Sequence, residues 1–292
     1  RKACLAAADF EGCVRSYTKS AKKVKVQEFD FKKKIKYLTK AIKIQSNNYE
    51  KRKLYAERGI YKRDIGDYAG AIADFSMAIE FYPKGKNIYY LYAEMARIKE
   101  GQLKDYNGAI KDYSNALNND FISDRYFLIY LRKRALLKTQ IKDFKGAIDD
   151  YSLVLNIKDS FSAIQKKVPL SKSDISKIYS ALSLNKSKIN DNKGAIDDYA
   201  KAIEIDPNNF EAYVVRGDFE ESYEKAIFFY TKSLEINPNL TEVYYKRGML
   251  KDLLGDQVGA LNDYSSVIKI NPNAEHYHNR ADLRAYYKDY SG

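Results

Sequence analysis

A short motif recurs along the chain and constrains the fold more than any other feature of the sequence. Its clearest copy spans Gly66–Ile79 and reads GDYAGAIADFSMAI. The small residue at its centre recurs at Ala71, Ala109, Ala147, Ala195, Ala226 and Ala260, with spacings of 38, 38, 48, 31 and 34 residues. Spacings of this size are typical of helical solenoids. Because such a unit buries its apolar face only against its neighbours, the motif predicts a stack of repeated units.

Each copy of the motif has the pattern of an amphipathic helix. Its apolar residues recur at i, i+4, i+7 and i+8, as in Ala71, Phe75, Ala78 and Ile79. Asp67 precedes the helix, where a carboxylate accepts hydrogen bonds from free backbone N–H groups. Gly66 suits the left-handed residue that ends the preceding helix. Proline then stops four of the copies, at Pro83, Pro207, Pro238 and Pro272.

A second helical stretch lies before the motif and often carries an arginine followed by a small residue. These pairs are Arg58-Gly59, Arg134-Ala135, Arg216-Gly217, Arg247-Gly248 and Arg280-Ala281. A tyrosine stands three residues before the arginine in most of them, at Tyr55, Tyr213, Tyr244 and Tyr277. The small residue lets the next helix approach closely. Each unit is therefore predicted to be a helix A, a tight turn and a helix B.

At this point the sequence resembles the tetratricopeptide repeat family, in its bacterial multi-repeat form. The resemblance rests on units such as Tyr244…Arg247-Gly248…Gly255-Asp256…Ala260…Tyr264…Pro272, and it covers nearly the whole chain. It implies an all-α fold, an α-solenoid of stacked antiparallel helix hairpins in a right-handed superhelix. A related family with longer repeats is the alternative.

The repeats suggest how the chain is organised. We expect residues 1–45 to form an irregular basic helical region with partial repeats. Residues 46–292 are expected to form a solenoid of about six units and a truncated C-terminal repeat. The last four residues, DYSG, begin a further motif, so the chain is expected to be a fragment of a longer solenoid.

Two places depart from the regular pattern. The unit of Ala226 is about three residues short, which we assign to its turn. A long join runs from Asn156 to Ser173, and the next helix is expected to begin near Ser171, with Asp174 completing a capping box.

The resemblance also implies a site, because the face of helix A opposite its packing face lines a concave, peptide-binding groove in this family. In one unit this face comprises Lys53, Ala56, Ile60 and Arg63. The matching residues elsewhere include His278 and are otherwise Tyr90, Arg97, Arg132, Leu136, Lys177, Ser180, Leu184, Val214, Asp218, Tyr245, Met249 and Asp252. The Lys, Asn and Arg set with which some members clamp a peptide carboxylate is absent, since Ala56, Ser180, Val214 and Tyr245 occupy those places. A solvated face without a dedicated ligand is the alternative.

Charge is concentrated near the N-terminus. Residues 1–63 hold 19 basic and 6 acidic side chains, whereas residues 64–292 hold 32 and 33. The lysine-rich run from Lys19 to Lys43 could contact phosphates or an anionic membrane surface. Yet its apolar residues fit one helix face, namely Ile35, Leu38, Ala41 and Ile42. Lysine also outnumbers arginine by 14 to 5 in residues 1–63, although bidentate phosphate contacts favour arginine. Anion binding is therefore the alternative function, and nucleic acid is not the expected partner.

The remaining reactive side chains form no catalytic pattern. Cys4 and Cys13 could form a disulfide across a predicted turn, or could both be small packing residues. His278 and Asp282 would make half of a metal site, and no third ligand is evident. One acid recurs in each unit and is interpreted as scaffold chemistry, at Asp74, Asp112, Asp150, Asp198 and Asp263. We therefore predict no enzyme activity, no cofactor and no metal.

Together these features predict a non-catalytic interaction scaffold for a protein or peptide partner. No apolar run approaches the ~18 residues of a membrane-spanning helix, so we expect a soluble chain, in a cytoplasmic, periplasmic or secreted compartment. An arm of a larger enzyme is a further alternative. The last helix A lacks its helix B, so its apolar side near Tyr277, Ala281 and Tyr286 is expected to mediate self-association.

Overall fold

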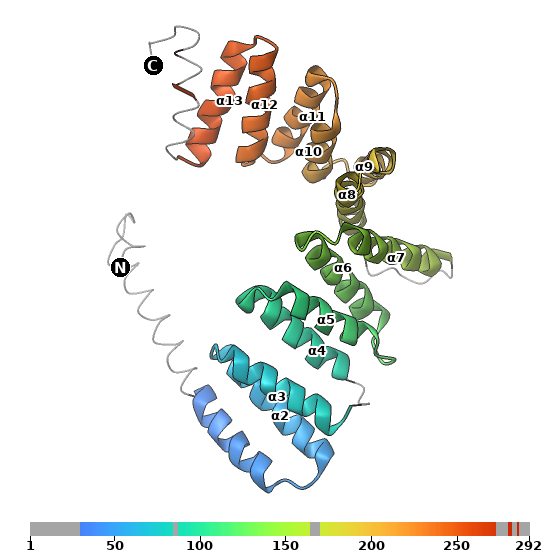
Figure 1. The fold of residues 1–292 in the computed structure, drawn as a ribbon, viewed down its shortest axis with the longest axis vertical. Helices are drawn as coiled ribbons and strands as arrows, with labels where there is room; N and C mark the ends of the chain where they lie inside the picture. Colours follow the sequence, from blue (N-terminus) through green and yellow to red (C-terminus); the bar gives the residue numbers. More distant parts are fainter. Residues whose placement is uncertain (1–29, 84–86, 164–169, 273–279, 282–284, 286–292) are drawn as a thin grey trace. The chain divides into compact units, whose positions relative to one another are not determined.

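The computed structural model describes residues 30–83, 87–163, 170–272, 280–281 and 285, and its regular elements there are helical (Figure 1). The absence of strands from these residues confirms the predicted all-α class. A helix over residues 30–44 comes first. The elements that follow are α2 (Asn48–Asp64), α3 (Tyr68–Phe81), α4 (Ile88–Ile98), the π-helical turn η2 (Lys99–Leu103), α5 (Tyr106–Leu117), α6 (Asp124–Gln140), α7 (Phe144–Ala163), α8 (Lys172–Lys188), α9 (Asn192–Ile205), α10 (Phe210–Phe219), α11 (Tyr223–Ile236), α12 (Thr241–Leu253) and α13 (Gln257–Ile270).

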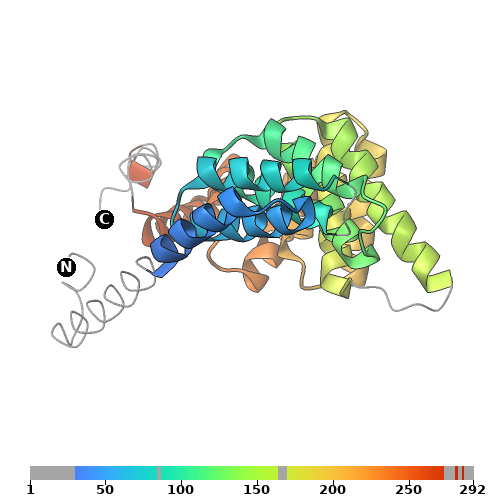
Figure 2. The same cartoon turned by 90° about the horizontal axis from the view of Figure 1, so that it is seen from below.

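The chain divides into two compact units, Arg1–Ile141 and Lys142–Gly292. Helices that follow one another in sequence pack together from α2 to α6 in unit 1 and from α7 to α13 in unit 2 (labelled in Figure 1; Figure 2 shows the same helices from below). These neighbours run antiparallel, which confirms the predicted stack of helix hairpins. We call α2, α4, α6, α8, α10 and α12 the A helices, and α3, α5, α7, α9, α11 and α13 the B helices. The predicted boundary at residue 45 stays a prediction.

An aspartate caps five of the B helices, and this cap explains the glycine that stands three residues after it. The Asp67 carboxylate accepts a hydrogen bond from the backbone N–H of Gly70 at 3.0 Å. The same bond, at 2.9–3.0 Å, reaches Asp105 from Gly108, Asp143 from Gly146, Asp191 from Gly194 and Asp256 from Gly259. A Cβ on Gly70 would lie 2.2 Å from the Asp67 carboxylate, so a larger residue would displace the cap. The predicted cap is confirmed.

The predicted ends of the helices are also confirmed. Gly66 has a φ of 85° and Gly255 a φ of 81°, the left-handed backbone that follows the ends of α2 and α12. Helices α3, α9, α11 and α13 end two residues before Pro83, Pro207, Pro238 and Pro272. Proline punctuates these repeats because it cannot donate the next helical hydrogen bond.

Close packing within a hairpin depends on the small residue of the A helix. A Cβ added to Gly59 of α2 would lie 2.7 Å from the ring of Phe75 on α3, and one added to Gly217 would lie 2.5 Å from Tyr230. The core between α3 and α4 combines Ala71, Phe75, Ala78, Leu91, Met95 and Ile98. Each hairpin thus buries its apolar face against the next, as stacked repeats require.

Two irregular places differ from the sequence-based expectation. Helix α7 continues to Ala163, so the prediction that a join begins at Asn156 is wrong, because no helix-stopping residue lies there. The helix after the join does begin with the predicted capping box, in which Ser171 Oγ accepts from the Asp174 N–H at 3.0 Å. The short unit of Ala226 keeps a three-residue turn between its helices. Its A helix is short instead, with 10 residues in α10 against 13 in α12.

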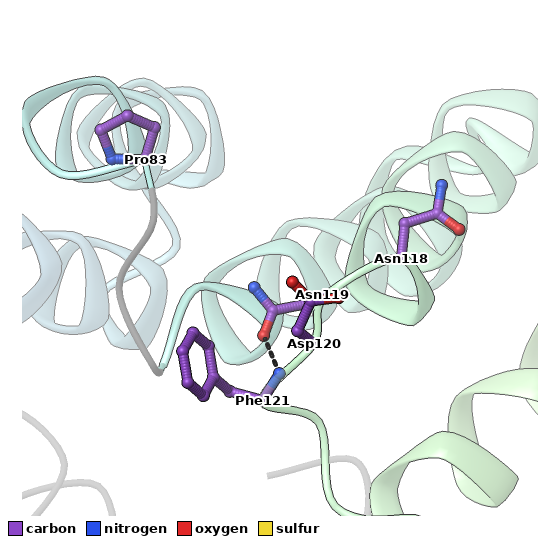
Figure 3. Close-up of a pocket in the computed structure, with 5 residues that line it drawn as sticks. All are labelled: Pro83, Asn118, Asn119, Asp120 and Phe121. Carbon is purple, nitrogen blue, oxygen red and sulfur yellow. Dashed lines mark hydrogen bonds between the residues drawn. The ribbon is translucent and has the colours of Figure 1, made fainter.

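Two loops of unit 1 border a hollow of about 440 Å³ (Figure 3). Pro83 lies on its α3 side, and Asn118, Asn119, Asp120 and Phe121 follow α5 on the other. The Asn119 side-chain oxygen accepts a hydrogen bond from the Phe121 N–H at 3.1 Å, which fixes the loop. The hollow lies at the end of the unit where the A helices begin and the B helices end.

Candidate functional site

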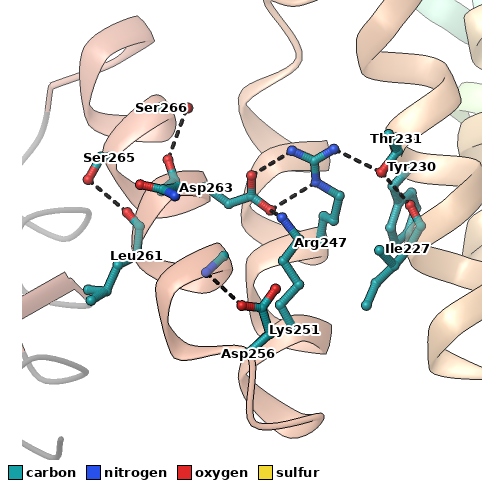
Figure 4. A network of polar contacts seen from close by, with 12 residues as sticks. Ile227, Tyr230, Thr231, Arg247, Lys251, Asp256, Leu261, Asp263, Ser265 and Ser266 are labelled. Atoms are coloured by element: carbon teal, nitrogen blue, oxygen red, sulfur yellow. Dashed lines mark hydrogen bonds and ion pairs between the residues drawn. The ribbon is translucent and has the colours of Figure 1, made fainter.

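A buried carboxylate on the B helix joins two basic side chains on the A helix of the same hairpin. Asp74 is 3% exposed and accepts hydrogen bonds from Arg58 Nε at 2.7 Å and Nη2 at 2.6 Å, and Lys62 Nζ lies 3.0 Å from it. We call this arrangement the hairpin clamp. Unit 2 repeats it with Asp263, Arg247 and Lys251 (Figure 4).

Two further hairpins keep the lysine of the clamp. Lys99 lies 2.6 Å from Asp112, and Lys186 lies 2.6 Å from Asp198. Burial raises the pKa of Asp112 above its ordinary value, against the opposing effect of Lys99. The lysine precedes the acid by 12 residues in three hairpins and by 13 where η2 adds one residue to the turn. The recurring acids are therefore scaffold chemistry, as predicted.

The arginine of the clamp also reaches the helix that precedes its hairpin. Arg58 Nη1 donates to Thr39 Oγ1 at 3.0 Å, and Arg247 Nη1 donates to Thr231 Oγ1 at 2.9 Å. One side chain therefore ties three consecutive helices together. Because this contact fixes the rotation of the A helix, it also fixes which side chains the helix presents outward.

The α10–α11 hairpin replaces the clamp with a different arrangement. Phe229 stands where the other hairpins carry the acid, three residues after the motif alanine. Arg216 pairs instead with Glu220 at the end of its own helix, at 2.5 Å. Its guanidinium lies 5.2 Å from the ring centre of Phe229 and 4.7 Å from that of Tyr199. Cation–π contacts thus take over part of the role of the ion pair.

One register position recurs along the A helices, directly after the buried small residue. We call it the face position, and its occupants are Ile60, Arg97, Leu136, Leu184, Asp218 and Met249. Three of these are apolar and exposed, with Leu136 at 43%, Leu184 at 38% and Met249 at 44%. Ile60 is instead half-buried against the α3–α4 core. The face position is therefore the part of the predicted groove that most often reaches solvent.

In unit 1, ion pairs connect successive A helices along the predicted face. Glu94 of α4 is 2% exposed and pairs with Arg63 of α2 and with Arg97 of α4. Glu100, in the turn that follows α4, lies 3.3 Å from Lys133 of α6. The remaining predicted residues of this unit are also near solvent, with Tyr90 exposed and Arg132 half-buried.

Tyrosines pack behind these ion pairs. Tyr130 of α6 lies 5.7 Å from Tyr113 of α5 and 5.9 Å from Tyr126, measured between ring centres. The Tyr113 hydroxyl donates to Glu100 at 3.2 Å. Tyr130 is 1% exposed, and its hydroxyl has no hydrogen-bond partner among the residues that the structure describes. Burial raises the pKa of Tyr130 to about 12.

In unit 2, the predicted groove residues divide by exposure. Lys177, Leu184, Asp218 and Met249 are exposed, whereas Val214, Tyr245 and Asp252 are half-buried. Ser180 is only 5% exposed, and its hydroxyl accepts a hydrogen bond from Asn209 Nδ2 at 2.9 Å. The same amide donates to Ser176 at 2.7 Å. Ser180 therefore lies inside the joint between α8 and α10 and is not available to a partner.

An ion pair connects α10 to α12 on the same face. Lys246 Nζ lies 2.9 Å from the Asp218 carboxylate, which also accepts a hydrogen bond from the Tyr230 hydroxyl at 2.7 Å. Burial and this bond both raise the pKa of Tyr230 above its ordinary value. Asp218, predicted as a groove residue, thus also holds two helices together.

Sequence reasoning missed several residues that shape these faces. Glu94, Lys246 and Asn209 form contacts between repeats, and no repeated pattern in the sequence marks them. The lysine of the clamp did carry a signal, because it precedes the recurring acid by a nearly constant number of residues. That spacing places the two side chains on facing sides of a hairpin.

Other predicted features lie wholly or partly outside the described residues. Cys4, Cys13, Tyr277, His278 and Tyr286 belong to these, so the disulfide and the self-association surface stay predictions. In the helix over residues 30–44, Leu38 and Ile42 are buried, as the predicted helix face requires. Within the described part of the chain, no three His, Cys, Asp or Glu side chains gather as a metal site would need. None of the helices described there combines the length and apolar character of a membrane-spanning segment.

The fold and the repeated clamp define a helical-hairpin repeat protein, and comparison with known proteins agrees. The family model for the tetratricopeptide repeat matches residues 176–209 and 218–240, in the hairpins of α8–α9 and α10–α11. No curated protein matches the sequence. A solved tetratricopeptide repeat protein from Parabacteroides merdae aligns with a TM-score of 0.61 at 18% identity, over 83% of this chain and 88% of its own.

Two further solved structures share the fold. The C-terminal part of a repeat-containing protein from Cytophaga hutchinsonii aligns with a TM-score of 0.58 at 16% identity, over 87% of this chain and 98% of its own. The pilF protein of Pseudomonas aeruginosa aligns with a TM-score of 0.54 at 15% identity, over 80% of this chain and 98% of its own. Residues 176–209 and 218–240 are thus similar to tetratricopeptide repeats, and the chain shares the helical-hairpin repeat fold of these solved structures. None of these likenesses supports the anion-binding alternative.

Proposed function

We propose that the chain is a non-catalytic scaffold that binds a peptide, a helix or a partner domain along its A helices. Each unit has its own binding surface. The unit-1 face comprises Arg63, Tyr90, Arg97, Arg132 and Leu136. The unit-2 face comprises Lys177, Leu184, Val214, Asp218, Tyr245, Met249 and Asp252.

The observation that carries this proposal is the exposed apolar residue at the face position. Leu136, Leu184 and Met249 occupy it on three different A helices, each about two-fifths exposed. Single exposed apolar residues are common, but here three of the six A helices carry one at the same register, so the apolar side chain is a recurring feature of this position. The hairpin clamp supports the proposal, because it orients the A helices before any partner arrives.

The charged residues of the two faces indicate the chemistry of the partner. The unit-1 face carries Arg63, Arg97 and Arg132, whereas the unit-2 face includes Asp218 and Asp252. A partner of unit 1 is therefore expected to combine apolar side chains with acidic ones. Mixed apolar and charged contacts of this kind are usual where a protein surface binds a segment of another protein.

The test is capture of protein partners from the native source with the full chain as bait. Leu184→Ala and Leu136→Ala should each reduce recovery of a specific partner about fivefold or more, as buried apolar anchors do. Ile196→Ala and Leu153→Ala are matched controls, because these residues are 38% and 41% exposed on the B helices α9 and α7. Equal losses in face and control variants, or full recovery by both face variants, would contradict the proposal.

A further inference from the structure

The helix over residues 30–44 carries a strong excess of positive charge. It contains six lysines, no arginine and one acid, Asp30. All of the lysines are exposed, namely Lys32, Lys33, Lys34, Lys36, Lys40 and Lys43. Among the residues that the structure describes, Lys36, Lys40 and Lys43 have no ion-pair partner. The charge of these three lysines is therefore not used to hold the fold together.

One side of this helix packs against α2, beside which it lies in Figure 1. The rings of Phe31 and Tyr61 are 5.3 Å apart between their centres, and Thr39 accepts a hydrogen bond from the clamp arginine of α2 at 3.0 Å. Leu38 and Ile42 follow Phe31 by seven and eleven residues, which places all three on one side of the helix. Leu38 and Ile42 are buried, so this side anchors the helix to unit 1.

The opposite side combines lysines with two apolar residues that are exposed to solvent. Tyr37 is 66% exposed and Ile44 is 86% exposed, the largest value for a large apolar residue in the described part of the chain. Helical spacing places both on one side with four of the lysines. We call this side the lysine face, and it comprises Lys33, Lys36, Tyr37, Lys40, Lys43 and Ile44. None of these residues is acidic, so the face is positively charged with two apolar points.

The lysine face is not suited to the stacking of a further hairpin. Thr39 accepts its hydrogen bond from the arginine of the helix that follows, as Thr231 of α11 does. The helix over residues 30–44 therefore has the register of a B helix. In that register Lys34, beside the lysine face, stands where α11 has Ala226, which lies in an apolar core. A lysine at this position would bring its charge into such a core, so this side of the helix is built for a polar environment.

We infer that the lysine face binds the surface of an anionic lipid bilayer, a function additional to that of the A-helix faces. Ammonium groups are attracted to anionic headgroups without a defined bonding geometry, and each lysine near such a surface strengthens binding about fivefold. Tyr37 and Ile44 enter the boundary between headgroups and acyl chains, where aromatic and apolar side chains are favoured. Charge attracts the helix, and the two apolar residues hold it at the surface.

Three features favour a bilayer over nucleic acid as the anionic partner. The helix contains lysine and no arginine, whereas bidentate contacts to phosphate favour arginine. Ile44 has no ring on which a base could stack, but it gains by leaving water for the apolar part of a bilayer. The helix is about 22 Å long, at 1.5 Å per residue, so its open side can lie flat along a membrane surface.

The test measures how the full chain partitions onto vesicles of phosphatidylcholine with about 30% phosphatidylserine, at about 0.1 M salt. We expect binding that weakens as salt is added. A triple variant, Lys36→Gln with Lys40→Gln and Lys43→Gln, should lower the partition coefficient about 100-fold. The matched control removes the same charge from the B helices α5, α7 and α9, by glutamine at the exposed Lys111, Lys145 and Lys193. It should lower the partition coefficient by less than about fivefold, because these lysines lie away from the lysine face.

A second pair of variants tests the apolar contribution. Ile44→Ala should lower the partition coefficient about fivefold, since membrane binding scales with the apolar area that is buried. Leu253→Ala is its control, because Leu253 is 64% exposed at the end of α12, and it should have no effect. Circular dichroism of each variant confirms that the helices are retained. Leu136→Ala and Leu184→Ala should also leave the partition coefficient unchanged, so the outcome is distinguishable from failure of the two A-helix faces.

Several results would overturn the inference. One is no binding to the anionic vesicles, and another is equal binding to vesicles of phosphatidylcholine alone. Equal losses in the triple variant and its lysine control would show that the face has no special role, and equal partition of Ile44→Ala and Leu253→Ala would show that no apolar contact forms. Binding to duplex DNA without binding to vesicles, lost in the triple variant, would assign the face to nucleic acid instead.

Discussion

The guanidinium of Arg58 on α2 donates two hydrogen bonds to the carboxylate of Asp74 on α3, at 2.7 Å and 2.6 Å. Because the carboxylate is buried, removing one partner leaves the other as an uncompensated charge. We expect Asp74→Ala to lower the free energy of unfolding of unit 1 by about 3–5 kcal/mol. Amide hydrogen exchange in α2 and α3 measures this change locally.

The control for the clamp is an ion pair on the surface. Lys232 and Glu235 of α11 lie 2.7 Å apart, with side chains 41% and 55% exposed. Glu235→Ala should change the free energy of unfolding by about 0–1 kcal/mol. A similarly small effect for Asp74→Ala would show that the clamp does not hold the hairpin together.

Gly59 and Gly101 differ in the space around them, although both lie in helical segments. A Cβ at Gly59 would lie 2.7 Å from Phe75, whereas nothing lies within 4 Å of one at Gly101. Gly59→Ala should destabilise unit 1 by about 1–3 kcal/mol through overpacking. Gly101→Ala should be neutral or slightly stabilising. Urea denaturation of both variants compares them, and equal midpoints would contradict the packing argument.

Two buried tyrosines allow a matched test of hydrogen bonding. In the described part of the chain the Tyr130 hydroxyl has no hydrogen-bond partner, whereas the Tyr230 hydroxyl donates to Asp218 at 2.7 Å. Tyr130→Phe is expected to be neutral or to raise the free energy of unfolding by about 1 kcal/mol. Tyr230→Phe should lower it by about 1–3 kcal/mol, because it removes a bond to a charged group. Thermal denaturation of the two variants gives the signs, and a clear loss in Tyr130→Phe would contradict the structure.

Burial of tyrosines also predicts that the stability of the fold depends on pH above neutrality. The pKa values of Tyr130 and Tyr264 are raised by burial to about 12, against roughly 10 for an exposed tyrosine. The folded state therefore holds these protons more tightly than the unfolded state does. Their contribution to the free energy of unfolding is complete below pH 10 and is lost as the pH rises to about 12. In Tyr130→Phe the loss of unfolding free energy between pH 10 and pH 12 should be smaller than in the unaltered chain by roughly 2–3 kcal/mol. Urea denaturation at several pH values tests it, and an unchanged pH dependence in the variant would contradict it.

The sequence predicts the repeat well because its signals are local. Asp67 and Gly70 specify a cap within one turn of helix, and Pro83 marks where that helix ends. Neither feature depends on distant contacts. The fold class and the hairpin turns follow from such signals, as does the interpretation of the recurring acids.

Features that depend on neighbouring repeats could not be predicted in this way. Ser180 matches a groove residue by its register but is buried, because Asn209 at the start of the next A helix reaches over it. Glu94 is buried between two arginines, one of them on a different helix. The exact length of α10 also depends on packing, since Glu220 at its end pairs with Arg216.

The central claim is that the A-helix faces bind a protein partner, and site-specific photo-crosslinking tests it most directly. Leu184 on α8 and Ile196 on α9 are each 38% exposed in the same hairpin, so they differ in the face on which they lie. Each is replaced in turn by photo-reactive p-benzoylphenylalanine, and the chain is irradiated with proteins from its native source. A specific crosslinked product at position 184 that is missing at position 196 is the predicted result. Equal crosslinking at both positions, or a product at position 196 alone, would contradict the account.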